Sequence, residues 1–192
     1  LKAAADLFGK EGFEKTTTHK MVKAAGVSVG TFYAYFKDKE SILLELFDKH
    51  AGELFEVLDR PFEEVDWDNL TVRSLIRSAI EASVECNALN PKLHRLFCER
   101  SRHSLLTTKR EEWEKKALDR MTELIRFGAE HVRISDPETA AFLIYNAVNA
   151  ACMQAIVFEE GPSMTKLVDG LTDLVSRFVL LDSEKSESPR TA

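Results

Sequence analysis

Apolar residues recur every three or four positions along most of this chain, which is the spacing of helices with one buried face. Leu1, Ala4 and Phe8 form the first such stripe, and Gly12 follows where a helix over 1–10 would end. The alternating β-branched runs that predict strands are absent from the sequence. The pattern therefore predicts an all-α protein.

Capping side chains divide the rest of the first sixty residues into three further helices. They start at Thr17, Ser28 and Asp38, and Pro61 is expected to end the last one. The predicted spans are 17–25, 28–36 and 38–60. Gly26 permits a sharp turn between the two short helices, and this spacing is that of a helix-turn-helix.

The chain beyond Pro61 is expected to form a larger bundle of longer helices. Proline-containing breakers separate them near Pro91, Pro137 and Pro162. The predicted spans are 69–88, 91–105, 108–132, 137–158 and 164–181. The segment 182–192 is rich in Ser and Glu and contains a proline, so we expect a disordered tail there.

The short helix 28–36 has two different faces. Phe32 and Phe36 lie four residues apart and, with Val27, form an apolar stripe that would pack inward. The hydroxyl groups and the tyrosines are left facing outward. Such a face suits DNA, where hydroxyls reach phosphates and base edges and methyl groups meet thymine. The alternative is that the two tyrosines only cover the side of a small three-helix core.

A series of short motifs follows in order through the first 46 residues. They are LF in the first helix, Gly12-Phe13, the threonines before the second helix, KAAGVS, GT-aromatic-Tyr, Phe36 and the DKE that opens the fourth helix. The segment LKAAADLFGKEGFEKTTTHKMVKAAGVSVGTFYAYFKDKESILLEL thereby resembles the DNA-binding domain of the TetR family of bacterial transcriptional regulators. The resemblance implies a helix-turn-helix domain over 1–46 and a helical effector-binding and dimerisation domain over 47–181.

The resemblance also implies which residues contact DNA. Those placed against phosphates or bases are Thr16, Thr17, Ser28, Val29, Gly30, Thr31, Tyr33, Ala34, Tyr35 and Lys39. Residues 28–36 contain no Arg, Lys, Asn or Gln, so this helix lacks the side chains for bidentate reading of guanine or adenine. We expect readout through thymine methyls, hydroxyl contacts and DNA shape, with Lys37 or residues before Leu1 supplying any guanine contact. Lys20 stands where many members have an acid.

Two C-terminal helices are predicted to form a homodimer interface. Helix 164–181 has a wide apolar face, and helix 137–158 carries small residues that let another helix approach closely. The residues assigned to the interface are Ala147, Ala151, Leu167, Leu171, Leu174 and Phe178. The alternative is that the same residues belong to the core of one chain.

The middle helices offer a candidate site for a small, largely apolar effector. Its predicted residues are His94, Phe97, Arg102, His103, Trp113, Tyr145, Asn146 and Asn149. Aromatic residues in such positions are more often plain core, and the polar groups could pair within the protein instead. His94 and Cys98 are spaced to share a metal ion, but two further ligands are missing nearby, so neither metal nor cofactor is predicted.

Composition and charge narrow the function further. The net charge is −6, yet residues 1–50 carry eight Lys against seven Asp and Glu, so the first quarter is the part that an anionic polymer would tolerate. No P-loop, GxGxxG, HExxH or GxSxG motif predicts an enzyme. The apolar stretch 142–158 is judged too short and too polar for a membrane span, and a cytoplasmic location is expected.

These patterns and the resemblance together imply an effector-responsive transcriptional regulator that binds a palindromic operator as a homodimer and is released by a small, largely apolar ligand. The resemblance implies a repressor, since repression is the usual outcome in that family. The alternative is a helical ligand-binding or interaction protein that has lost specific DNA binding.

Overall fold

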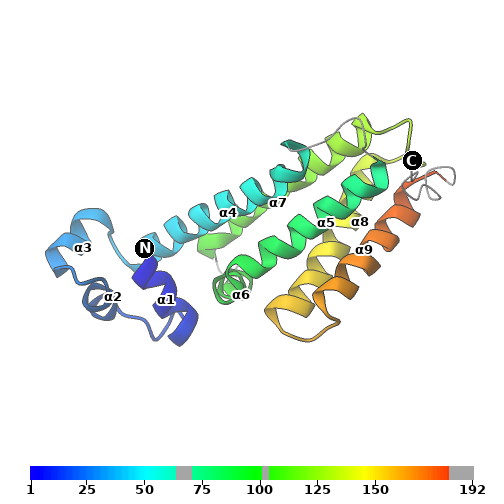
Figure 1. Ribbon diagram of the computed structural model, residues 1–192. Coiled ribbons are helices and arrows are strands. Elements are labelled where there is room, and N and C mark those ends of the chain that lie inside the picture. The colour runs from blue at the N-terminus through cyan, green and yellow to red at the C-terminus, as the bar shows by residue number, and fades with distance from the viewer. Residues whose placement is uncertain (64–70, 101–103, 182–192) are drawn as a thin grey trace. The chain divides into compact units, whose positions relative to one another are not determined.

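The computed structural model describes residues 1–63, 71–100 and 104–181, and confirms the prediction of an all-α protein (Figure 1). The helices are α1 (Lys2–Glu11), α2 (Thr18–Ala25), α3 (Val29–Tyr35), α4 (Lys39–Glu63), α5 (Val72–Leu89), α6 (Pro91–Arg100), α7 (Ser104–Phe127), α8 (Pro137–Cys152) and α9 (Met164–Val179). A π-helical turn, Met153–Val157, extends α8. The predicted tail, 182–192, and the predicted effector residues Arg102 and His103 lie outside the described residues.

The chain divides into two compact units that do not follow its order in sequence. The first unit contains residues 1–54 and 90–112, and the second contains 55–89 together with the chain from residue 113 onward. Both α4 and α7 contribute residues to each unit. The predicted domain boundary divides the sequence once, at residue 46. The first compact unit instead continues to residue 54 and also includes α6 and the start of α7.

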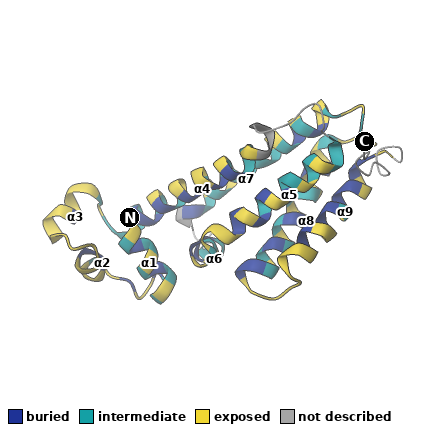
Figure 2. Ribbon diagram, viewed as in Figure 1, coloured by how far each residue is buried: buried dark blue, intermediate teal, exposed yellow. Residues whose placement is uncertain are grey.

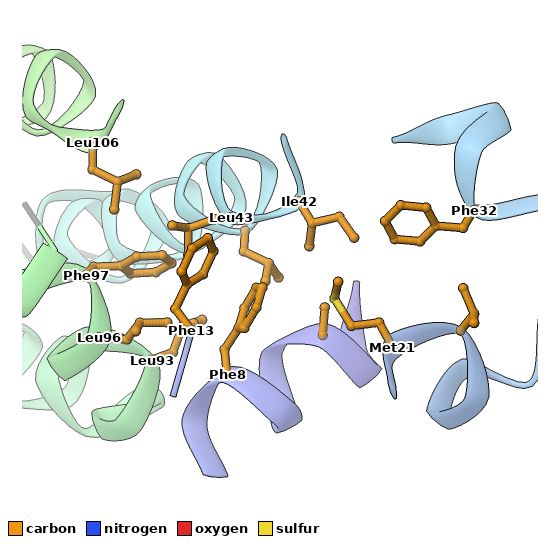
Figure 3. Packing of buried hydrophobic residues seen from close by; sticks show 13 residues of the cluster. Phe8, Phe13, Met21, Phe32, Ile42, Leu43, Leu93, Leu96, Phe97 and Leu106 are labelled. Atoms are coloured by element: carbon orange, nitrogen blue, oxygen red, sulfur yellow. The ribbon is translucent and has the colours of Figure 1, made fainter. Parts of the chain in front are cut away.

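The core of the first unit joins α1–α4 to α6 and the start of α7. Phe8 and Phe13 are 1% and 4% exposed, and their ring centroids lie 5.2 Å apart. Figure 3 shows these rings with buried residues of α4 and with Leu93, Leu96 and Phe97 of α6. Because α6 packs directly against α1, the helix-turn-helix segment shares its core with residues some eighty positions further along the chain.

The core of the second unit lies between α5, α8 and α9. Two ion pairs, Arg73–Asp173 at 3.5 Å and Arg77–Asp169 at 2.8 Å, show that α5 and α9 run antiparallel. The face of α9 that packs in this core is lined by Leu167, Val168, Leu171, Val175 and Val179. Full burial of one such side chain contributes about 2 kcal/mol. These five residues are most of the apolar residues of α9, so most of its apolar face is buried within its own chain.

Several helix ends differ from those expected. Pro61 does not end α4, which continues to Glu63. α7 runs Ser104–Phe127 rather than 108–132, so it begins four residues early and ends five early. The predicted helix 137–158 is regular to Cys152 and then widens into the π-helical turn.

Candidate nucleic-acid interface

The two short helices are built by local caps and one left-handed turn. Thr17 caps α2, since its Oγ1 accepts a hydrogen bond from the main-chain N–H of Lys20 at 3.3 Å. Gly26 then adopts φ 67° and ψ 28°, a conformation that glycine enters without steric penalty. Ser28 caps α3 by accepting from the N–H of Thr31 at 3.0 Å, and the two side-chain oxygens lie 2.9 Å apart. These contacts fix where α3 begins.

The predicted base-reading face of α3 is on the protein surface. Phe32, 6% exposed, anchors the helix to the core, and Phe36 packs partly against it. The exposed residues of α3 and its flanks include Ser28, Val29, Gly30, Thr31, Tyr33, Ala34, Tyr35 and Lys37. Figure 2 shows most of the α3 ribbon in the colour of exposed residues. Tyr35 is the most exposed ring of this helix, at 79%. All the predicted contact residues of this helix therefore lie together and are open to solvent.

Two residues are not where the sequence placed them. Thr16 was predicted to contact DNA, but it is 1% exposed and its Oγ1 donates to the main-chain oxygen of Gly12 at 2.8 Å. Its hydroxyl is thus already bonded within the turn between α1 and α2. Val27 was predicted to pack inward, yet it is 43% exposed because it follows the left-handed turn at Gly26 rather than lying on the helix.

The lysines near this surface differ in what they contact. Lys20 Nζ donates to Glu11 and, at 3.1 Å, to the main-chain oxygen of Lys15, and this hydrogen bond from Lys20 lowers the pKa of the Glu11 carboxyl. Its charge is therefore compensated within the fold. Lys39 stands at the first turn of α4, where Asp38 accepts from the N–H of Ser41 at 2.7 Å. The Lys39 side chain is half-buried and its Nζ donates to the main-chain oxygen of Phe13 at 3.2 Å.

The predicted effector residues fall into two separate groups. His94 and Phe97 belong to the first unit, where Phe97 is 5% exposed in the core. Trp113 and Tyr145 belong to the second unit, with ring centroids 6.2 Å apart. Asn149 is half-buried in this second unit. Asn146 is exposed on α8 and donates from Nδ2 to the Phe142 oxygen at 2.8 Å.

Sequence reasoning missed two members of these groups. Phe55 lies 5.8 Å from Trp113 between ring centroids and extends the aromatic cluster. His50 Nε2 lies 3.2 Å from His94 Nδ1, and burial lowers the pKa of each of these histidines to about 4. The signal for His50 was present, since it stands four residues after the buried Leu46 on the same face of α4. Across the described residues, no group of three His, Cys, Asp or Glu is placed to hold a metal ion.

The predicted dimer residues divide between core and surface. Leu167 and Leu171 are 6% and 7% exposed and belong to the core of their own chain, because α5 covers that face of α9. Ala151 packs partly against the same core. Leu174 and Phe178 are 53% and 38% exposed, and Ala147 is also exposed. The apolar surface available to a second chain is therefore the opposite side of α9 and the neighbouring side of α8.

The stretch 142–158 was judged from the sequence to be too short and too polar for a membrane span, but the helix at this place, Pro137–Val157, is longer. Its 21 residues and mean hydropathy of 1.5 would by length and composition allow it to cross a membrane. The core helix of a soluble protein passes the same test, and α8 packs against α5 and α9. Of the most apolar window of this helix, 33% is buried inside the chain, and Phe142 and Leu143 are exposed, so a large apolar surface remains on α8.

Comparison with known proteins covers both parts of the chain. Residues 1–46 match the model described as bacterial regulatory proteins, tetR family, and residues 71–178 match the tetracyclin repressor-like C-terminal domain. The fatty acid metabolism regulator protein of Bacillus subtilis is 36% identical over 64 residues, which are 33% of each chain, so this alignment spans one third of the relative. The uncharacterized HTH-type transcriptional regulator YhgD of B. subtilis is 26% identical over 148 residues, 75% of each chain.

Among solved structures, FadR from B. subtilis in complex with stearoyl-CoA has a similar fold. Its TM-score is 0.75 at 22% identity, with 91% of this chain and 94% of that chain covered. The fold of both the short helices and the helical bundle beyond them therefore has counterparts in known proteins.

Proposed function

Because this chain belongs to the TetR family of bacterial regulatory proteins, we propose that it is a ligand-responsive transcriptional regulator that binds a palindromic operator as a homodimer. Members of this family are transcriptional regulators, which are generally not enzymes. The observation that carries the proposal is the face of α3, whose hydroxyl groups and two tyrosine rings are exposed while Phe32 anchors the opposite side. The protein would act in the cytoplasm, and repression is the simplest outcome of operator binding.

The DNA contacts divide into two kinds. Thr17, Tyr33, Tyr35 and Lys39 are proposed to bind phosphates, which position the protein without reading sequence. The small residues at the start of α3 are proposed to meet base edges and thymine methyl groups. Since this helix offers no guanidinium or amide, DNA shape is expected to supply much of the remaining specificity.

A second copy of the chain is proposed to cover the exposed apolar side of α8 and α9. Leu174 and Phe178 present that surface on α9, and Phe142, Leu143 and Ala147 present it on α8. A two-fold pair of chains would carry two α3 helices, and such pairs bind DNA half-sites separated by about one helical turn or a multiple of it. This is why a palindromic operator is expected.

The effector is proposed to be small and largely apolar, and to bind within the second unit. Phe55, Trp113 and Tyr145 form an aromatic cluster there. Trp113 Nε1 is buried and has no hydrogen-bond partner among the residues that the structure describes, which leaves one donor for a ligand oxygen. The similarity to a fatty acid metabolism regulator and to a stearoyl-CoA complex makes fatty acyl compounds the first class to test.

Selection of bound fragments from a random duplex pool tests the DNA-binding proposal. The purified protein is expected to enrich a palindrome, and Tyr35→Ala is expected to lose it while keeping its thermal unfolding midpoint, since the ring is 79% exposed. Phe127→Ala is the matched control, because Phe127 is an aromatic ring 82% exposed in the second unit. If the wild-type protein enriches no sequence at low salt, the alternative of a ligand-binding protein without specific DNA binding gains support.

A further inference from the structure

Four side chains gather where the turn after α1 meets the start of α4 and the end of α6. Lys39 Nζ lies 4.2 Å and Arg100 Cζ lies 4.0 Å from the centroid of the same ring, that of Phe13. Phe13 is 4% exposed and belongs to the core of the first unit. Two cations are therefore held close to one aromatic ring, which attracts each of them individually.

The carboxylate of Glu14 lies between these two cations. Its Oε1 accepts from Arg100 Nη1 at 2.7 Å, whereas its Oε2 is 4.0 Å from Lys39 Nζ. The first distance is a hydrogen-bonded ion pair and the second is only a charge contact at the limit of such pairs. Arg100 thus holds Glu14, and Lys39 is the weaker partner.

Lys39 keeps the capacity to bind an anion in this arrangement. An ammonium has three N–H donors, and one goes to the main-chain oxygen of Phe13 at 3.2 Å. Its place in the first turn of α4, near main-chain N–H groups of the helix N-terminus, is favourable for a phosphate. A carboxylate bonded directly to the ammonium would cancel that attraction, and Glu14 is the carboxylate within reach.

We propose that Arg100 is a positioning residue for the DNA contact of Lys39. By binding Glu14, Arg100 keeps that carboxylate from neutralising the Lys39 ammonium. The charge that Lys39 offers to a phosphate therefore depends on the position of the last turn of α6. This inference rests on the proposed function, in which Lys39 binds the DNA backbone.

The test is the salt dependence of operator affinity, measured with the full-length protein and the duplex that the random pool yields. Each phosphate neutralised by a cation adds about 0.9 to the slope of log affinity against log salt, and a dimer carries two copies of the cluster. Arg100→Gln is expected to reduce the slope by up to about 2 and to weaken binding about ten-fold near physiological salt. Arg100→Lys is expected to retain both values, because an ammonium can also bind Glu14 and lie against the ring.

Combining Arg100→Gln with a second substitution distinguishes a positioning role of Arg100 from a direct DNA contact or a role in stability. In Glu14→Gln the carboxylate is gone, so adding Arg100→Gln is expected to change affinity less than two-fold. In Lys39→Gln the contact itself is gone, so adding Arg100→Gln is again expected to have little effect. Thermal unfolding midpoints of all variants verify that the first unit remains folded.

Two results would overturn the inference. One is that Arg100→Gln binds the operator with the affinity of the wild type. The other is that Arg100→Gln loses as much affinity in the Glu14→Gln background as it does in the wild-type background, which would mean that Arg100 touches DNA directly or supports the fold. In both cases the wild type still binds its operator, so the proposed function survives. If the wild type binds no duplex, the proposed function fails and this inference fails with it.

Discussion

Acid is expected to destabilise this protein through the paired histidines of the first unit. His50 Nε2 and His94 Nδ1 lie 3.2 Å apart, and burial holds the pKa of both at about 4. Both rings are therefore neutral in the folded protein at neutral pH, while in the unfolded chain they bind protons near pH 6.5. The unfolded state thus binds more protons between these values, and stability falls as the pH falls from about 6.5 to about 4.

The size of the effect follows from the two pKa values. A fall from 6.5 to about 4 corresponds to about 3 kcal/mol for each histidine once the pH is below the lower value. Between about pH 7 and about pH 5.5 the same relation gives about 1 kcal/mol for each ring, or about 2 kcal/mol for the pair. Domains are typically stable by about 5–15 kcal/mol, so this loss is readily measured.

Urea unfolding at about pH 7 and about pH 5.5 measures this loss. The double variant His50→Leu/His94→Leu is expected to lose less stability between these two values, and His19→Gln, at an exposed position, is the matched control. This window avoids the carboxylates of Asp136 and Asp173, whose pKa values are held below their usual range by bonds from Thr139 and Arg177. Equal losses in the wild type and the double variant would refute the reasoning.

Three further predictions test the interface and the dimer. Gly26→Ala is expected to lower the free energy of unfolding by about 1–2 kcal/mol in urea titrations, since φ is 67° there. Gly30→Ala is expected to fold normally, because among the described residues an added Cβ would meet within 4 Å only Ser28 Oγ, at 3.7 Å, but to weaken operator binding, because the added methyl group would keep the start of α3 from approaching the bases closely. Leu174→Asp is expected to yield monomers in sedimentation experiments and to lose operator binding, whereas Leu89→Asp, also at an exposed leucine, should remain dimeric.

Features set by neighbouring residues could be predicted from the sequence. The caps at Thr17 and Ser28 and the turn at Gly26 occur as expected, because each depends on side chains within four residues. The exposed face of α3 follows from the same logic, since Phe32 fixes which side of a short helix is buried. Helical periodicity therefore predicted this surface, except at Val27, which precedes the helix and is exposed.

Features set by distant segments could not be predicted in the same way. Thr16 is a local exception that was also missed, because the bond that its Oγ1 donates to the Gly12 oxygen spans only four residues. The place of Leu167 and Leu171 depends on α5, which covers the stripe that the sequence offered to a second chain. Periodicity shows that a face is apolar but does not show which helix covers it.

The shared core of the first unit limits how such proteins can be recombined. A hybrid regulator made by exchanging residues 1–46 between relatives would transfer Phe8 and Phe13 without the α6 residues Leu93, Leu96 and Phe97 that pack with them. The junctions would expose apolar surface or create cavities, even if every DNA-contacting residue were retained. An exchange that also carries residues 90–112 would move the whole core at once, so engineered specificity in this fold requires two crossover segments rather than one.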